Sequence, residues 1–132
     1  MGSLDSAARV PEPRCRSPLG VRQDARMITV VSQAWSKDEG ESADSYIAMS
    51  AAFLDFLKQH PGFLGRRLIR GVEDRTHFTN LRFFDSLESY EELTQLEGYS
   101  DYMVAMYEHL KPYDSYPREF MEVVLDDDPV IR

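Results

Sequence analysis

The chain has 132 residues, of which 42% are hydrophobic and 29% charged, enough for one globular domain but not for two independent cores. A formal net charge of −8 argues against a nucleic-acid partner, because phosphate contacts need a basic surface, and no apolar run approaches the roughly 20 residues that span a membrane. The single cysteine, Cys15, excludes an internal disulfide and, with only three histidines, a thiolate zinc cluster, so we expect a cytoplasmic protein.

Residues 1–26 differ in composition from the rest of the chain. They contain three prolines and no aromatic residue, and they carry five arginines against three acidic residues. This composition is typical of a disordered tail, so we expect the folded domain to comprise residues 27–128. Residues 27–132 hold ten basic and twenty acidic residues, which makes the domain more acidic than the whole chain. Met27 directly precedes the first expected strand, and an internal start at Met27 and a dispensable N-terminal extension are both open interpretations.

From Met27 onward, β-branched residues, helix-capping residues and turn residues predict alternating strands and helices. In chain order we expect a strand at 28–35, then a helix that is capped by Ser42 or Asp44, has Leu57 on its inner face and is stopped by His60-Pro-Gly62. Strands at 63–70 and 76–85, a helix from Ser86 to Gly98, a helix from Tyr99 to Leu110 and a strand at 117–125 follow. The last helix carries an apolar stripe at three- and four-residue spacing, formed by Tyr99, Tyr102, Met103, Met106 and Leu110.

This order of elements is that of the ferredoxin-like βαββαβ fold, an α+β architecture with an antiparallel sheet. Its two helical regions can cover only one face of the sheet. The third strand nevertheless carries large apolar residues on both faces, with Phe78 and Phe84 on one and Leu81 and Phe83 on the other. A strand that is apolar on both faces needs cover on both. We therefore predict a homodimer in which two sheets pack face to face.

Three segments resemble the antibiotic biosynthesis monooxygenase family, namely His60-Pro-Gly-Phe-Leu-Gly65, Asn80-Leu-Arg-Phe-Phe-Asp-Ser-Leu-Glu-Ser-Tyr90 and Glu97-Gly-Tyr99. The resemblance covers nearly all of residues 27–125 and implies a dimeric α/β barrel. Some members of this family oxidise anthrones, quinols or other electron-rich aromatic compounds with dioxygen and without a metal or flavin, whereas others bind and degrade haem. The resemblance therefore implies a small aromatic substrate, dioxygen and no cofactor, with haem as the alternative.

The anthrone-oxidising branch of the family has an Asn, a Trp and a Tyr where this chain has Asn80, Phe84 and Tyr90. Asn80, Arg82 and Phe84 alternate along one strand and so share a face, and Tyr90 can lean over that face from the next helix. The candidate catalytic residues are therefore Asn80, Arg82 and Tyr90, with Phe84 as a substrate-binding wall. Because Phe84 stands where the family has Trp, the indole N–H donor is missing.

The implied chemistry needs little from the protein, because an electron-rich phenolate or carbanion can itself pass an electron to dioxygen. Asn80 can donate a hydrogen bond to the substrate oxygen, Arg82 can stabilise the anion, and Tyr90 can bind the substrate or a peroxide intermediate. Each residue also has a structural interpretation. Asn80 can satisfy a backbone group, Arg82 can pair with a surface or dimer carboxylate, and Tyr90 can belong to the core.

Three further residues are candidates for substrate binding. Trp35 ends the first strand and covers either the mouth of the pocket or a dimer interface. Tyr99 and Met103 belong to the stripe of the last helix, which would favour a flat aromatic ligand if that helix roofs a cavity.

For the haem alternative, His109 is the candidate iron ligand, although the haem-degrading relatives place theirs about a turn or more earlier, where this chain has Met103. The Asn on the first strand and the Trp on the second helix that mark those relatives are absent here. We therefore expect a cofactor-independent monooxygenase for a quinol-, anthrone- or polyketide-like aromatic compound. A haem-binding or haem-degrading protein and a non-catalytic ligand-binding protein are the alternatives.

Overall fold

The computed structural model describes residues 27–112 and 117–127. Its elements are β2 (Ile28–Trp35), α1 (Glu41–Ala52), α2 (Leu54–Leu57), β3 (Phe63–Arg70), β4 (His77–Phe84), α3 (Leu87–Thr94), α4 (Tyr99–Tyr107) and β5 (Arg118–Glu122). The predicted tail at 1–26 and the last residue of the predicted domain, Asp128, lie outside the described residues. Within the described ranges, no helix is long and apolar enough to cross a membrane.

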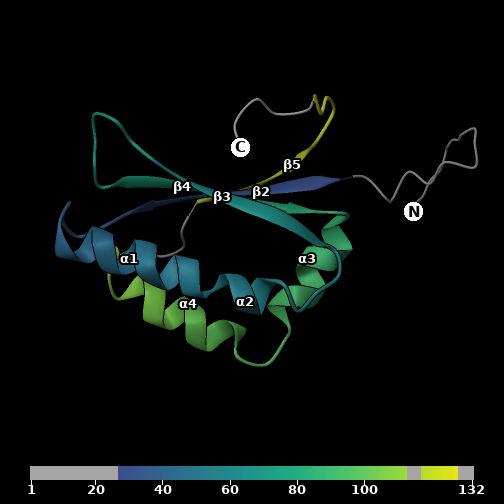
Figure 1. The fold of residues 1–132 in the computed structure, drawn as a ribbon, viewed down its shortest axis with the longest axis horizontal. Helices are drawn as coiled ribbons and strands as arrows, with labels where there is room; N and C mark the ends of the chain where they lie inside the picture. Colours follow the sequence, from purple (N-terminus) through teal and green to yellow (C-terminus); the bar gives the residue numbers. More distant parts are fainter. Residues whose placement is uncertain (1–26, 113–116, 128–132) are drawn as a thin grey trace, which may run out of the picture.

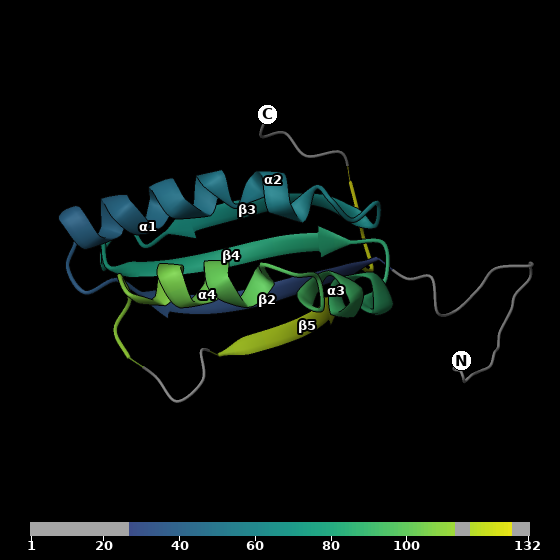
Figure 2. The ribbon, with the colours of Figure 1, turned by 90° about the horizontal axis from the view of Figure 1, so that it is seen from below.

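The four strands form one sheet in the order β3-β4-β2-β5, and every neighbouring pair is antiparallel. This confirms the predicted ferredoxin-like α+β fold. The first two strands have the predicted bounds, and β4 is one residue shorter at each end than expected. The helices all lie on one side of the sheet, and the other side carries no helix (Figure 1). Figure 2 shows α1 and α2 over β3, and α4 over β4 and β2.

The pairing of the central strands β2 and β4 decides which side chains face the helices. Val30 lies opposite Arg82 and Ala34 opposite Phe78, and all four are buried beneath the helices. The next pair along the strands, Val31 and Leu81, points to the uncovered side, because successive strand residues alternate between faces. We call the helix-covered side the inner face and the uncovered side the outer face.

The first helix begins at Glu41, so the predicted caps Ser42 and Asp44 both lie inside it. The reason is a cap outside the helix: the Asp38 carboxylate accepts hydrogen bonds from the backbone N–H groups of Gly40 (2.9 Å) and Ser42 (3.0 Å). These backbone hydrogen bonds, that from Ser42 above all, hold the pKa of Asp38 below its usual value.

The predicted helix up to Leu57 is divided at Phe53, where α1 ends and the four-residue α2 follows.

The second helical region is also divided. Ser86 caps α3 as predicted, with its hydroxyl oxygen accepting a hydrogen bond from the Ser89 N–H at 3.1 Å. The helix ends at Thr94 and not at Gly98. Gly98 instead adopts a left-handed conformation (φ 98°) immediately before α4, a backbone geometry that favours glycine. The predicted stripe of α4 is confirmed, because Tyr99 and Met106 are buried against the core.

Gly62, in the turn between α2 and β3, lies directly against the N-terminus of α3. Its backbone N–H donates a hydrogen bond to Nδ1 of His60 at 2.9 Å, and its carbonyl oxygen accepts one from the backbone N–H of Asp85. A Cβ atom at Gly62 would overlap the Ser89 side chain and lie 2.6 Å from the Asp85 carboxylate. The glycine is therefore required by close packing of the turn on α3.

We predict that Gly62→Ala lowers the free energy of unfolding by about 1–3 kcal/mol, the usual cost of forcing atoms into a filled space. Urea denaturation followed by circular dichroism measures the change. The exposed neighbour Pro61 is the control, since Pro61→Ala fills no space and should cost less than about 1 kcal/mol. Equal effects of the two substitutions would contradict the packing argument.

Candidate functional site

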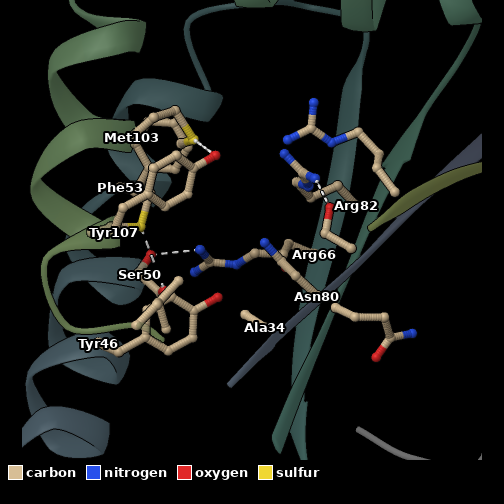
Figure 3. Close-up of a pocket in the computed structure, with 14 residues that line it drawn as sticks. Ala34, Tyr46, Ser50, Phe53, Arg66, Asn80, Arg82, Met103 and Tyr107 are labelled. Atoms are coloured by element: carbon tan, nitrogen blue, oxygen red, sulfur yellow. Dashed lines mark hydrogen bonds between the residues drawn. The ribbon is translucent and has the colours of Figure 1, made fainter. Parts of the chain in front are cut away.

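A cavity lies between the inner face of the sheet and the helices α1 and α4, and we call it the central cavity (Figure 3). All four strands contribute to its floor, through Ser32, Gln33, Ala34, Arg66, Asn80, Arg82 and Arg118. The helical side forms its roof, through Tyr46, Ser50, Phe53, Met103, Met106, Tyr107 and Leu110. Polar and cationic groups thus gather on the sheet side, and aromatic and sulfur-containing groups on the helix side.

Arg82 is the most buried charged residue of the floor, with 4% of its surface exposed. Its Nη2 donates to the Ser32 hydroxyl at 2.5 Å, and its guanidinium lies 5.7 Å from the centre of the Tyr90 ring. The Nε atom of Arg82 is buried and has no hydrogen-bond partner in the described part of the chain. A buried N–H donor is costly to leave unpaired, so this atom is available to a ligand.

Arg66 lies directly opposite Arg82 across the β3–β4 pair, so two like charges face each other on the floor. The Nη1 atom of Arg66 donates to the backbone carbonyl of Ser50 on α1, at 2.5 Å. Burial is the main cause that lowers the pKa of Arg66, and the charge of Arg82 lowers it further. The third cation, Arg118, lies opposite Ser32 across the β2–β5 pair.

Asn80 occupies the floor two residues before Arg82 on the same strand, opposite Ser32. Its side-chain oxygen, Oδ1, is buried without a hydrogen-bond partner among the described residues. The structural interpretation of Asn80, in which its amide satisfies a neighbouring backbone group, therefore does not account for this oxygen. The free atom is an acceptor, so in this orientation Asn80 can accept a hydrogen bond from a ligand hydroxyl.

The roof is built from flexible and aromatic side chains held by weak contacts. The Tyr107 hydroxyl donates to the Met103 sulfur at 3.8 Å, and the Ser50 hydroxyl donates to the Met106 sulfur at 3.8 Å. Burial raises the pKa of Tyr46, so its hydroxyl stays protonated at neutral pH.

The free space inside the central cavity is about 40 Å³. An engineered cavity that binds benzene measures about 150 Å³, so the central cavity must widen to admit an aromatic ring. Met103 and Met106 are suited to this movement, because methionine has three rotatable bonds and adapts its shape at low cost.

The structure brings together some of the predicted site residues and separates others. Asn80, Arg82 and Met103 line the central cavity. Phe84 and Tyr90 lie behind it, where their rings meet edge to face at 5.5 Å. Both are buried and neither lines the cavity, so the Tyr90 ring contacts the site through Arg82.

Tyr99 is likewise a core residue, packed against Phe53 and Phe56 at centroid distances of 6.1 Å. Trp35 lies on the outer face of the sheet, where its ring stacks on His77 at 4.7 Å. Trp35 therefore does not cover the mouth of the central cavity. Its other predicted position, in a dimer interface, stays a prediction.

The donor atoms of the central cavity do not fit a histidine-ligated haem. No histidine or cysteine is among the described residues that line it, and His109 is a turn residue after α4 whose side chain lies elsewhere. The described ranges also contain no group of three or more His, Cys, Asp or Glu side chains that could hold a metal ion. We derive no chemistry through haem for this chain.

Arg66, Arg118, Tyr46 and Ser50 were not predicted as site residues. Alternation along the second strand does place Arg66 on the same face as Leu68 and Arg70, but it does not show which strand lies beside it. A register shift between Phe63 and Gly65 also interrupts the alternation of side chains along β3. Because of this shift, Phe63 and Arg66 both lie on the inner face. No local pattern signals Arg118, which reaches the site only because β5 pairs with β2.

The architecture of the chain was compared with known proteins. No family model and no curated protein matches the chain in sequence. Solved structures do match. An asparagine-to-alanine variant of SnoaB, a cofactor-independent oxygenase from Streptomyces nogalater, aligns with a TM-score of 0.67 and 13% identity over 80% of this chain and 100% of SnoaB. The described residues thus share their whole architecture with that protein.

Two further structures are of proteins proposed to be antibiotic biosynthesis monooxygenases. The protein from Bordetella bronchiseptica has a TM-score of 0.66 and 17% identity over 76% of this chain and 99% of its own. The protein from Caulobacter crescentus has a TM-score of 0.66 and 16% identity over 77% of this chain and 93% of its own. This chain has the fold of these proteins. The resemblance seen in the sequence is thereby confirmed at the level of the fold.

We predict that replacing Arg82 with an apolar side chain of similar length raises stability. Arg82→Met removes a buried charge that has no carboxylate partner in the described part of the chain and that faces Arg66. Because buried charges are costly to desolvate, we expect the free energy of unfolding to increase by about 1 kcal/mol, measured by urea denaturation. Arg75→Met, at an exposed turn position, is the control and should bring no gain. A loss of stability in Arg82→Met alone would show that Arg82 is a structural residue.

Proposed function

We propose that this protein is a cofactor-independent monooxygenase that oxidises an electron-rich aromatic substrate with dioxygen in the central cavity. The observation that carries the proposal is the buried guanidinium of Arg82, whose Nε has no partner, beside the unpartnered Oδ1 of Asn80. A donor and an acceptor that the fold leaves unsatisfied at one place form a binding site for a phenol or an enolisable ketone. The aromatic and methionine side chains of the roof suit the ring of such a substrate.

In the proposed reaction the substrate releases a proton to water and becomes an electron-rich anion, and a proton is taken up again when the water product forms. The oxygen of that anion accepts hydrogen bonds from Arg82, whose fixed charge stabilises it. Asn80 orients the substrate by accepting a hydrogen bond from a second hydroxyl group. The anion reduces dioxygen directly. For an anthrone, one oxygen atom becomes the new carbonyl and the other leaves as water, so the methylene group supplies all four electrons and no external reductant is needed.

Tyr90 is a positioning residue in this proposal. Its ring lies under Arg82, and its pKa is raised, chiefly by burial, so the phenol is neutral at pH 7 and cannot serve as a base there. The ring, rather than the hydroxyl, is what holds the guanidinium toward the cavity. This differs from the role expected from the sequence, in which the hydroxyl bonds the substrate.

The fold supports the proposal, because SnoaB, a cofactor-independent oxygenase, has the same architecture at 13% identity. Asn80 and Arg82 carry the functional argument. An oxygenase of this kind would need no cofactor, because the substrate anion is the reductant.

We predict that the purified protein consumes oxygen with anthrone or with another member of a quinol and anthrone panel. Asn80→Ala should lower kcat/KM about tenfold, and Arg82→Met about a hundredfold, the usual cost of losing a group that stabilises a developing oxyanion. An oxygen electrode measures the rates, corrected for spontaneous oxidation of each substrate. No uptake with any substrate would overturn the proposal and favour a non-catalytic ligand-binding protein.

The role of the Tyr90 ring has its own test. We predict that Tyr90→Phe, which keeps the ring under Arg82, retains at least half of the activity, whereas Tyr90→Leu loses about tenfold in kcat. The same oxygen electrode assay applies. If Tyr90→Phe were as inactive as Tyr90→Leu, the hydroxyl would be the functional group.

We also propose that two copies pack through the outer faces of their sheets to form a homodimer, the dimeric α/β barrel expected from the resemblance. Leu64, Ile69 and Met121 point to this face and are each about half exposed, at 51%, 50% and 51%. No helix covers this face (Figure 1). An uncovered apolar sheet face is a common subunit interface, because burial of its side chains stabilises association.

Light scattering after size-exclusion chromatography should give twice the 15.2 kDa mass of the chain at micromolar concentration. Ile69→Lys, which places a charge in the proposed interface, should give the mass of one chain. The control is Val104→Lys on α4, a residue 63% exposed and distant from the outer face, which should remain dimeric. A monomeric native protein would refute the dimer.

A further inference from the structure

The central cavity has a charge opposite to that of the domain around it. Residues 27–132 contain ten basic and twenty acidic side chains, yet three of the ten basic residues line this one cavity. None of the acidic residues that the structure describes lines it. An acidic domain therefore holds a concentrated positive field at the site proposed for the substrate.

These charges are not neutralised by the described part of the chain. Arg66 donates to a backbone carbonyl and Arg82 to a hydroxyl, both of them neutral acceptors. The two arginines also occupy opposite positions on neighbouring strands, and the charge of Arg82 contributes to the lowered pKa of Arg66, as repulsion between them predicts. A negatively charged ligand would offset both the repulsion and the desolvation of these cations.

The proposed reaction accounts for only one of the three cations. It develops a single negative charge on the reacting oxygen, and Arg82 is the residue placed to stabilise that charge. The other two cations have no role in that reaction. Arg66 lies on one side of Arg82, and Arg118 lies on the other side, at the exposed margin of the floor. Their planar guanidinium groups match the two oxygens of a carboxylate.

The cavity is also divided into two kinds of surface. Arg66 and Arg82 belong to the strands of the floor, and Phe53, Met103 and Tyr107 belong to the roof (Figure 3). A ligand that satisfies both surfaces has an anionic group on one side and an aromatic body on the other. Resting on the proposed function, we propose that the substrate is an aromatic carboxylic acid whose carboxylate binds Arg66 while its reacting oxygen faces Arg82, and that Arg118 attracts the acid at the margin of the floor.

Binding is tested first, with two compounds that cannot be oxidised in this reaction, naphthalene-2-carboxylate and naphthalene-2-carboxamide. They have the same ring and differ in charge. Isothermal titration calorimetry of the full chain at low salt should show the carboxylate binding at least tenfold more tightly. Equal affinities, or no binding of the carboxylate at millimolar concentration, would overturn the proposal.

Three variants connect this preference to the named residues. Arg66→Gln and Arg118→Gln should each reduce the ratio of the two affinities at least threefold, and Arg118 is exposed, so its replacement leaves the fold intact. Arg75→Gln removes the same charge from the β3–β4 turn, outside the cavity, and should leave the ratio unchanged. If the ratio were unchanged in both Arg66→Gln and Arg118→Gln, or fell equally in Arg75→Gln, the preference would reflect the net charge of the protein. Either result would overturn the assignment of carboxylate binding to these residues.

Oxygen uptake separates this proposal from the proposed function. The native protein should oxidise both anthrone and anthrone-2-carboxylate, with the lower KM for the carboxylate, and Arg66→Gln should raise the KM for the carboxylate more than the KM for anthrone. Uptake with anthrone but no preference for its carboxylate would overturn the acid specificity alone. Arginine-dependent binding of naphthalene-2-carboxylate without uptake on any substrate would overturn the oxygenase alone and support the acid-binding site.

Discussion

The pairing of β2 with β4 is the constraint on which the rest of the molecule depends. In the observed register Val30 faces Arg82 and Ser32 faces Asn80, all of them on the helix-covered side. A slip by one residue would move this whole set to the outer face, since side chains alternate along a strand. The register is held by the apolar residues at the two ends of the same face, where Phe78 and Phe84 are buried beneath the helices. Burial of these rings therefore positions the polar groups between them.

The inner face of the sheet thus has apolar ends and a polar centre. Its centre carries cations that no described carboxylate neutralises, which a fold selected only for stability would avoid. Natural proteins tend to retain such costly groups at functional sites, where an unsatisfied donor or acceptor is available to a ligand. The unpartnered atoms of Asn80 and Arg82 are of this kind, and they lie in the same cavity. In the proposal made above, the groups that destabilise the floor of the cavity are the same groups that bind an anion.

The roof complements this floor by being adaptable rather than charged. Met103 and Met106 leave little free volume between themselves and the sheet, yet their contacts with Tyr107 and Ser50 are weak sulfur hydrogen bonds. In the proposed function, the sheet holds the charges and the adaptable helical wall makes room for the aromatic ring. The layers themselves are common to this chain and SnoaB at 13% identity.

Much of the fold could be predicted from the sequence, because strands and helices follow from local patterns. The strands 28–35 and 63–70, the Ser86 cap and the glycine before α4 all depend on residues close together in the chain. That Asn80 and Arg82 share a face likewise follows from alternation alone. The start of α1 was misplaced because its cap, Asp38, lies in the preceding loop.

What the sequence by itself determined is therefore the order of the elements and the face on which each strand residue lies. Only the tertiary structure decided that Arg66 and Arg118 join Arg82, and that Tyr90 lies behind Arg82 rather than in the cavity. It also placed Trp35 on the outer face, stacked on His77. These residues come from strands and helices far apart in the chain, and their meeting depends on which strands pair and how the helices pack, which no local periodicity encodes.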